Sequence, residues 1–299
     1  MTELINILKQ QNIEFKTDEP MKAHTTFKIG GAADILITVN GVDELRTVLL
    51  ACRGEGVPVM ILGKGSNLLV SDDGIEGAVI ALDGAFKEIT VDGDIITCGA
   101  GVSLSKLCTV ALEKGLSGLE FAYGIPGTVG GAVYMNAGAY NGETKDVCFE
   151  ADYLTPDGEI GVCAGKDLDF SYRHSIFKTN DNIILFAKYK LTPDDPEAIR
   201  ARMDDFMNRR RTKQPLEYPS AGSVFKRPKD AFAGTLIQQC GLKGTSVGGA
   251  QVSEKHAGFI INTGDATCED VLGLVRLVQD TVREQTGYQL ECEIIRTGR

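Results

Sequence analysis

The sequence predicts a mixed α+β protein built in two parts. Amphipathic stretches, in which apolar residues recur every three or four positions, alternate along the chain with short runs rich in valine, isoleucine and leucine. The segment TPDDP at 192–196 combines two prolines with two aspartates and marks a boundary. We therefore expect a larger mixed domain before this segment and a smaller one after it.

The first part opens with helices and strands in alternation. Residues 3–10 predict an amphipathic helix, and residues 33–39 predict a strand. Asp43 is predicted to cap a second helix, and this helix is expected to end at Gly54 and Gly56. A buried strand over 57–62 then leads into a loop that contains two glycines.

The elements after this loop exclude two familiar nucleotide-binding motifs. A Rossmann fold would begin a helix here. The sequence instead predicts a strand over 78–82 and a hairpin with strands 86–91 and 94–98. A Walker A loop fails as well, because the glycine it requires upstream of Lys64 is absent and Pro58 lies in that neighbourhood.

Capping signals define the remaining elements. Ser103 is placed to cap a helix that Gly115 ends, and Pro196 suits the first turn of another helix. Thr267 is placed to cap the last helix, which stops at Gly287. We expect helices over 103–114, 196–211 and 268–285, and strands over 147–154, 183–191 and 289–295.

Two glycine-rich segments carry the strongest functional signal. The first is LGKGSNL at 62–68, and the second is GLEFAYGIPGTVGGAVYMNAGAYN at 118–141, which is almost uncharged and too poor in side chains to form much core. Glycine lacks Cβ, so such loops let backbone N–H groups approach a large or anionic ligand closely. Either loop alone is typical of an ordinary tight turn. Together they favour one nucleotide cofactor held from two sides.

Composition narrows the class of protein. The 299 residues are 43% hydrophobic and 24% charged, as in soluble globular proteins, and the net charge of −10 argues against nucleic acid or a membrane surface as partner. The eight cysteines form no C-x-x-C pair, so we expect mostly buried, reduced thiols. The start shows no signal-peptide pattern and no run is long enough to span a membrane, so we expect a cytoplasmic protein.

No metal site is predicted, because none of the three histidines has a partner at ligand spacing. Four polar features remain, each with an ordinary structural explanation. Arg173 lies between aromatic residues and could simply pack on a ring, and Ser223 could be a turn former. Glu291 and Glu293 share a face of the last predicted strand and could be solvated. Arginines and lysines at 209–213 and 226–227 could end a helix, or bind a diphosphate.

Six segments occur in a fixed order along the chain: GKGSNLLV (63–70), GLEFAYGIPGTVGGAVYMNAGAY (118–140), YRHSIFK (172–178), RRTKQPLEYPSAGSVFKRP (210–228), LKGTSVGGAQVSEKHAGFIIN (242–262) and LECE (290–293). Together they resemble the UDP-N-acetylenolpyruvoylglucosamine reductases, the flavoenzymes of bacterial peptidoglycan precursor synthesis. The resemblance covers the chain from about Thr25 onward. It implies non-covalent FAD, NADPH as hydride donor, and a FAD-binding domain of the vanillyl-alcohol-oxidase type in two subdomains, followed by an α+β substrate-binding domain.

The resemblance also implies domain bounds and site residues. The subdomains would be 1–83 and 84–192 and the C-terminal domain 193–299, with the last strand returning to the active site. The implied catalytic residues are Arg173, Ser223 and Glu293. The implied substrate contacts are Tyr140, Lys213, Arg227 and His256, and the implied cofactor contacts are Leu62, Gly63, Lys64, Gly65, Ser66, Asn67, Leu68, Gly124, Ile125, Pro126, Gly127, Thr128, Gly130, Gly131, Ala132, Asn136 and Gly138.

Two departures from the family pattern stand out. Some members carry a substrate-covering tyrosine on an insertion that is absent between Phe177 and Pro196 here, so this chain resembles the shorter subtype. The arginine that usually follows the glutamate by two residues is replaced by Ile295, and Arg296 comes next. The role of Arg296 is therefore open.

The implied reaction is reduction of an enolpyruvyl ether, with hydride from flavin N5 to the terminal carbon. Arg173 and Glu293 would stabilise the developing enolate, and Ser223 would protonate the adjacent carbon. The product would be UDP-N-acetylmuramate, and we expect a monomer acting on a small nucleotide sugar. Two alternatives stay open: another flavin oxidase of the same fold, or a nucleotide-sugar-binding protein without catalysis.

Overall fold

The computed structural model describes residues 1–299 and divides into two compact units that are discontinuous in sequence. One unit contains residues 1–16, 35–63 and 77–209, and the other contains 17–34, 64–76 and 210–299. Four elements continue from one unit into the other along the chain: β1 (Glu14–Pro20), β2 (Ala32–Val39), β5 (Ile75–Leu82) and α5 (Pro196–Lys213). The domain bounds at 83 and 192 stay a prediction.

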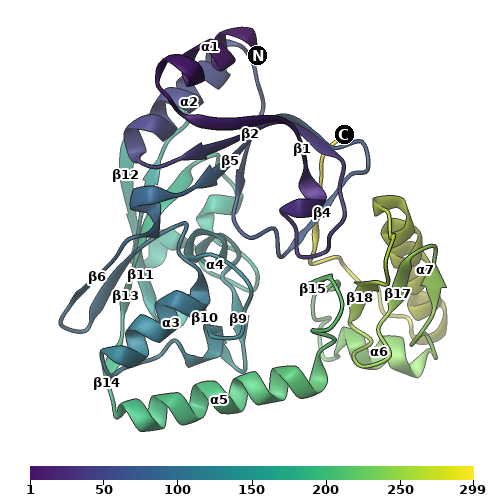
Figure 1. The fold of residues 1–299 in the computed structure, drawn as a ribbon. Coiled ribbons are helices and arrows are strands. Elements are labelled where there is room, and N and C mark those ends of the chain that lie inside the picture. The colour runs from purple at the N-terminus through teal and green to yellow at the C-terminus, as the bar shows by residue number, and fades with distance from the viewer. The chain divides into compact units, whose positions relative to one another are not determined.

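The first unit contains two sheets (Figure 1). Strands of one sheet follow the order β1-β2-β5-β3, with β3 (Val59–Leu62) parallel to β5. Its helices α1 (Thr2–Gln10) and α2 (Val42–Gly54) bury Leu4, Leu8 and Leu45 in the main core. The spacing of apolar residues predicted both helices because each helix buries one apolar face in the core on folding.

The second sheet of this unit is antiparallel, in the order β12-β11-β13-β7-β6. Helices α3 (Leu104–Glu113) and α4 (Val129–Met135) add their apolar faces to the same core. The strands of this sheet are β6 (Ile89–Asp92), β7 (Ile95–Gly99), β11 (Cys148–Leu154), β12 (Ile160–Ala164) and β13 (Ile183–Lys190). Two short antiparallel ribbons are separate from it: β8 (Leu116–Ser117) pairs with β14 (Thr192–Pro193), and β9 (Gly138–Ala139) pairs with β10 (Gly142–Glu143).

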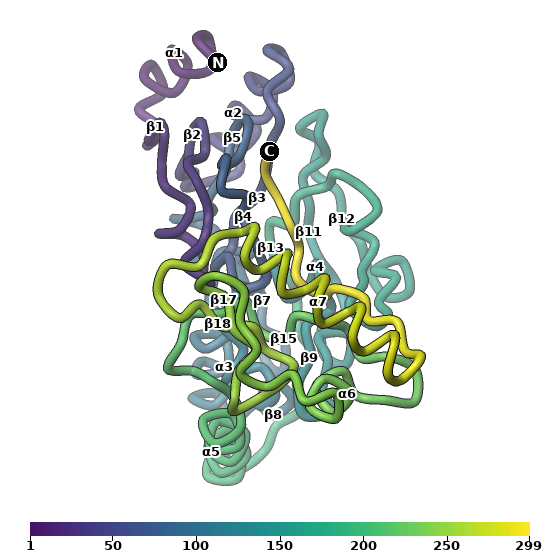
Figure 2. The backbone as a smooth tube through the Cα atoms, turned by 90° about the vertical axis from the view of Figure 1, so that its right-hand side faces the viewer, coloured from purple at the N-terminus to yellow at the C-terminus, as the bar shows by residue number.

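The second unit is a four-stranded sheet in the order β15-β18-β17-β16, with α6 (Ala233–Gln239) and α7 (Cys268–Thr286) packed beside it (Figure 1). The strands are β15 (Ser220–Ser223), β16 (Ser246–Val247), β17 (Ala250–Val252) and β18 (Phe259–Asn262). The C-terminal segment, yellow in Figure 2, ends in β19 (Ile295–Thr297), which pairs in parallel with β4 (Leu68–Val70). The chain end therefore closes on the segment that follows the first glycine loop.

Several sequence predictions are corrected. The cap of α2 is Gly41, and Asp43 lies in the first turn, where a carboxylate still interacts favourably with the helix dipole. Strand β3 buries only Leu62, and the first hairpin strand starts at Ile89 because residues 84–87 form a 3-10 helix. The last strand lies at 295–297 instead of 289–295, and Cys292 is exposed and forms only an isolated bridge to Phe225.

The second glycine segment also differs from expectation, because it contains helix α4. Thr128 caps this helix by accepting a hydrogen bond from the Gly131 N–H at 3.3 Å. Val129, Ala132 and Val133 are buried in the main core. The segment therefore contributes more to the core than its composition predicts. None of the helices is both long and apolar enough to cross a membrane.

Candidate active site

The two glycine loops meet within the first unit. Strand β3 delivers Gly63 to a position where an added Cβ would lie 2.7 Å from Oγ1 of Thr128, the cap of α4. The Leu104 N–H donates to the Gly127 carbonyl at 3.1 Å and fixes the second loop at this point. This geometry agrees with one ligand bound by both loops, because each presents backbone and hydroxyl groups here without side-chain bulk.

Gly65 belongs to the part of the first loop that lies in the second unit. Its φ is +58°, and an added Cβ would lie 2.3 Å from the His24 carbonyl oxygen. The Thr26 N–H donates to the Gly65 carbonyl at 3.3 Å. Glycine is therefore required here for the fold of the loop itself, independently of any ligand.

Gly130 and Gly131 differ in what surrounds them. A Cβ on Gly130 would lie 2.9 Å from the Cβ of Ala100, so this glycine serves packing. A Cβ on Gly131 would meet only Oγ1 of Thr128, at 3.5 Å. The backbone at Gly131 is thus approachable from outside, which is what a close cofactor contact requires. The open space at Gly131 means that this loop fits FAD, because the cofactor could approach the backbone N–H groups there.

Asn136, a predicted cofactor contact, is fully buried and in the left-handed conformation, with φ of 43°. Its Nδ2 donates to Glu143 Oε2 at 2.9 Å and to the Ser171 carbonyl at 2.8 Å, and its Oδ1 accepts from the Lys145 N–H at 2.9 Å. The side-chain amide is therefore satisfied by protein. It ties the NAGAY turn to the segment that precedes Arg173.

Arg173 also has a left-handed backbone, with φ of 56°, inside a turn closed by a bridge between Ser171 and His174. Its guanidinium carbon lies 5.1 Å from the Tyr172 ring centroid, and its Nη2 lies 3.5 Å from the Gly138 carbonyl. The ordinary packing of an arginine on a ring is thus present. A left-handed non-glycine residue costs conformational energy, which the surrounding contacts must offset.

Tyr140 lies in the turn between β9 and β10, again with positive φ, at 53°. Its ring stacks on Phe206 of α5 with 4.7 Å between centroids. The Arg209 guanidinium lies 5.8 Å from the same Phe206 ring. The sequence gives no signal for this partner, because the pairing joins segments that are distant along the chain.

Ser223 is the last residue of β15, is exposed, and pairs with Phe259 of β18. Gly222 before it has φ of +79°, which turns the chain at this point. Glu293 donates its N–H to the carbonyl of Val224, the residue after Ser223, at 2.7 Å. Two of the three predicted catalytic residues are therefore joined through adjacent backbone in the second unit.

The predicted substrate contacts of this unit lie on separate elements. Lys213 is the last residue of α5 and is exposed, and the Arg227 guanidinium lies 4.1 Å from the Phe232 ring centroid. His256 accepts a hydrogen bond from the Gly258 N–H at Nδ1, at 3.1 Å, and its ring lies 4.9 Å from Phe259. Burial lowers the pKa of His256, which favours the neutral imidazole near neutral pH.

The histidines, cysteines and acidic residues form no metal site, and the thiol of Cys98 is not reactive. No group of three histidine, cysteine or acidic side chains could hold a metal ion. All eight cysteines are free, and burial raises the pKa of Cys98 to about 12, so that thiol stays protonated and unreactive.

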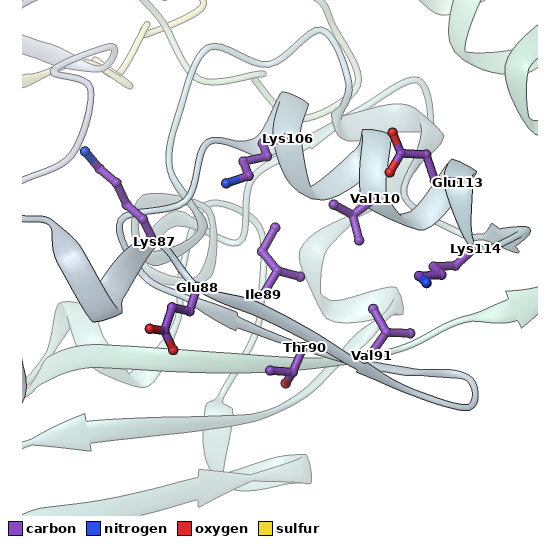
Figure 3. A pocket seen from close by; sticks show the side chains of 9 residues that line it. All are labelled: Lys87, Glu88, Ile89, Thr90, Val91, Lys106, Val110, Glu113 and Lys114. Carbon is purple, nitrogen blue, oxygen red and sulfur yellow. The ribbon is translucent and has the colours of Figure 1, made fainter.

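One cavity, of about 610 Å³, lies between β6 and α3 (Figure 3). Lys87, Lys106 and Lys114 reach its rim, over a floor that includes Ile89 and Val110. No residue of the predicted site lines it. The cavity therefore gives no support to the cofactor assignment, which depends on the glycine loops.

Comparison with known proteins defines the class first. Residues 33–164 match the FAD-binding domain family, and residues 214–297 match the UDP-N-acetylenolpyruvoylglucosamine reductase C-terminal domain family. With the α+β fold described above, the protein is an FAD-dependent oxidoreductase of the vanillyl-alcohol-oxidase fold type, as predicted from the sequence.

Full-length relatives then define the family. The UDP-N-acetylenolpyruvoylglucosamine reductase of Syntrophomonas wolfei is 47% identical over 98% of this chain and 97% of its own length. The corresponding Latilactobacillus sakei protein is 47% identical over 97% of this chain and 95% of its own. The crystal structure of the Thermus caldophilus reductase aligns with a TM-score of 0.82, at 38% identity, over 95% of this chain and 98% of that one. The chain belongs to the UDP-N-acetylenolpyruvoylglucosamine reductase family.

Proposed function

We propose that this chain reduces the enolpyruvyl ether of UDP-N-acetylglucosamine-enolpyruvate to UDP-N-acetylmuramate, with Arg173, Ser223 and Glu293 as its catalytic residues. The observation that carries the residue assignment is the hydrogen bond from the Glu293 N–H to the Val224 carbonyl, which fixes Glu293 beside the strand end that bears Ser223. Family membership supports the reaction itself.

When bound and reduced by NADPH, non-covalent FAD would supply the hydride for the terminal carbon of the enolpyruvyl group. A new C–H bond forms there, and the π electrons move onto the adjacent carbon and the carboxylate. Arg173 provides a fixed positive charge for the carboxylate, and Glu293 stabilises the enolate through a shared proton or hydrogen bond. Ser223 then gives its proton to the adjacent carbon and regains one from solvent, which completes the lactyl ether.

The remaining site residues bind and orient. The loops at 63–68 and 124–138 would hold the FAD through backbone N–H groups, since Gly131 is open to approach. Lys213 and Arg227 would pair with the diphosphate, and Tyr140 and His256 would contact the nucleotide sugar. Ser223 is exposed, so bound substrate and cofactor would have to exclude water from it.

Charge and composition support the remaining proposals. A net charge of −10 disfavours nucleic acid as a partner, and we expect a cytoplasmic monomer that acts on a small molecule. The domain bounds 1–83, 84–192 and 193–299 remain part of this proposal.

The test uses the purified protein and its flavin. The protein should be yellow, acid precipitation should release FAD into the supernatant, and anaerobic NADPH should bleach it. Addition of the enolpyruvyl nucleotide sugar should restore the colour and yield the lactyl ether. Flavin retained on the precipitated chain, or reoxidation by oxygen but not by this substrate, would indicate another oxidase. A colourless protein that binds the nucleotide sugar would indicate a binding protein without catalysis.

A further inference from the structure

The residue Asn67 lies in the first glycine loop, directly before β4. Its Nδ2 donates to the carbonyl oxygen of Glu293 at 3.1 Å, and its own carbonyl accepts from the Ile295 N–H at 2.9 Å. Asn67 therefore holds the chain on both sides of Ile294. Both contacts lie within the second unit and continue into the β4–β19 pairing, in which Leu68 is opposite Ile295.

Glu293 is consequently fixed through both of its backbone polar groups. Its N–H is bound to the Val224 carbonyl at 2.7 Å, and its carbonyl is bound to the Asn67 side chain. One residue further back, Cys292 forms a bridge to Phe225, and the Lys226 N–H donates to the Glu291 carbonyl at 2.8 Å. Holding both groups of one peptide residue restricts its φ and ψ, and so the direction of its Cα–Cβ bond.

This segment needs such support, because residues 290–294 form no regular strand. The alternating pattern predicts a strand there, which would have oriented Glu293 by its ladder. In the structure the ladder begins only at Ile295. The side-chain bond from Asn67 replaces the ladder bond that a strand would have supplied to the Glu293 carbonyl.

We propose that Asn67 is a positioning residue for Glu293, so that the first glycine loop sets the place of the catalytic carboxyl through this amide as well as contributing to the cofactor site. The inference rests on the proposed role of Glu293. It differs from the assignment of Asn67 as a cofactor contact, which predicts loss of FAD when the amide is removed.

The chain supplies a matched control. Gln279 of α7 donates its Nε2 to the Leu290 carbonyl at 2.9 Å, which is the same kind of bond to the same C-terminal segment, three residues before Glu293. Asn67→Asp keeps the shape of the side chain but replaces the donor by an acceptor facing a carbonyl. Asn67→Ala removes the donor without adding charge. Gln279→Glu and Gln279→Ala make the same changes at Leu290.

The experiment measures flavin content and the two half-reactions of the holoenzyme separately. With FAD added in excess, so that weaker cofactor binding is compensated, we expect reduction by NADPH to change much less than reoxidation in both Asn67 variants. Reoxidation by the enolpyruvyl nucleotide sugar should slow roughly 10- to 100-fold, since a small misplacement of a catalytic group costs about that much. The Gln279 variants should change neither half-reaction. In the flavin-free protein, deuterium exchange of the peptide covering 290–297 should be faster in Asn67→Asp than in wild type.

The outcomes separate this inference from the proposed function. Reoxidation that slows in Glu293→Gln but not in either Asn67 variant would overturn the positioning role alone. Normal reoxidation in Glu293→Gln would overturn the catalytic role of Glu293 and this inference with it. Loss of FAD from both Asn67 variants, with a normal reoxidation rate once excess FAD is added, would make Asn67 a cofactor ligand instead. In the double variant Asn67→Ala/Glu293→Gln, the two effects should not add, because Asn67 acts through Glu293.

Discussion

The ring of Phe206 stacks on the ring of Tyr140, with 4.7 Å between the centroids and 3° between the planes. Tyr140 is held at positive φ in a tight turn, and Phe206 comes from the middle of α5. The stack therefore fixes the orientation of a proposed substrate contact from a helix that contains no other predicted contact before Lys213. Aromatic pairs of this kind contribute about 0.5–1.5 kcal/mol beyond the area that they bury.

Phe206→Ala should accordingly raise the KM for the nucleotide sugar by roughly three- to tenfold. The rate of flavin reduction by NADPH should stay normal, because that step does not involve Tyr140. Phe206→Tyr, which keeps the ring, should behave like wild type. Met203→Ala removes a buried side chain from the same helix and controls for general destabilisation. An unchanged KM in Phe206→Ala would show that the stack serves packing only.

Gly65 and Gly93 provide a matched pair, because both have φ of +58° but only Gly65 is crowded. An alanine at Gly93 meets no atom within 4 Å, so only the backbone strain of about 1–2 kcal/mol applies. An alanine at Gly65 also collides with the His24 carbonyl and should cost about 1–3 kcal/mol more. Thermal unfolding and the flavin content of the purified variants check this. Equal stability of the two variants would contradict the crowding argument.

Gly131 tests the cofactor assignment without disturbing the fold. Gly131→Ala adds a methyl group whose nearest neighbour lies at 3.5 Å, and alanine is favoured over glycine in a helix by roughly 0.5–1 kcal/mol. The flavin-free protein should therefore be as stable as wild type or slightly more stable, while its affinity for FAD falls. Gly130→Ala, against Ala100, should lower stability instead. Titration of the flavin-free proteins with FAD gives the result, and unchanged affinity in Gly131→Ala would remove this glycine from the site.

The accuracy of the sequence predictions followed how local each signal was. Ser103 and Thr267 cap their helices as predicted, and the predicted hairpin forms around a two-residue turn at Gly93-Asp94, because a cap or a two-residue turn depends on neighbouring residues alone. Helix α4 was missed because its glycines have low helix propensity, which the Thr128 cap and the burial of Val129 and Val133 overcome.

Non-local pairings were the limit of the sequence analysis. The alternation over 289–295 predicted a strand, but pairing occurs only where β4 lies alongside, at 295–297. The same limit applies to the site. The two glycine loops could be assigned to one ligand, but the contact between Gly63 and Thr128, the partner of Tyr140 and the bond from Asn67 to Glu293 each join residues that no local pattern connects.

Glu120 and Arg202 predict how stability depends on pH. Glu120 is only 7% exposed, and this burial by itself raises the pKa of its carboxyl. Hydrogen bonds from Arg202, the Gly118 N–H and Ser117 have a larger effect in the opposite direction, so the pKa of Glu120 lies below the ordinary 4.5. A carboxyl whose folded pKa is lowered stabilises the fold above its unfolded pKa, and this contribution is lost as pH falls through the folded value. The free energy of unfolding in urea should therefore decrease below about pH 4.5. Glu120→Gln should reduce stability at pH 7 by roughly 1–3 kcal/mol and weaken this decrease. If the free energy of unfolding of Glu120→Gln decreased at low pH as much as that of the wild type, the decrease would come from other carboxylates.

The sharpest prediction concerns Ser223, because it separates a proton donor from a residue that only ends β15. Ser223 is exposed and its backbone, not its side chain, pairs with Phe259, so Ser223→Ala should leave folding, FAD binding and reduction by NADPH intact. Reoxidation by the enolpyruvyl substrate should slow by roughly 10²–10⁴-fold or more, as expected when a well-placed acid is removed. Substrate affinity should change little, since the hydroxyl acts on charge that exists only after hydride transfer.

Ser223→Cys should restore part of the lost rate, because a thiol at the same position can also donate a proton, whereas Ser223→Thr tests whether the added methyl group displaces the hydroxyl. Rapid-mixing absorbance of the reduced enzyme with substrate measures each rate directly. The product formed in deuterated solvent should carry deuterium at the carbon next to the carboxylate, because that proton comes from an exchangeable hydroxyl. Near-normal reoxidation in Ser223→Ala would contradict the assignment, and Glu293 or a bound water molecule would then have to supply the proton.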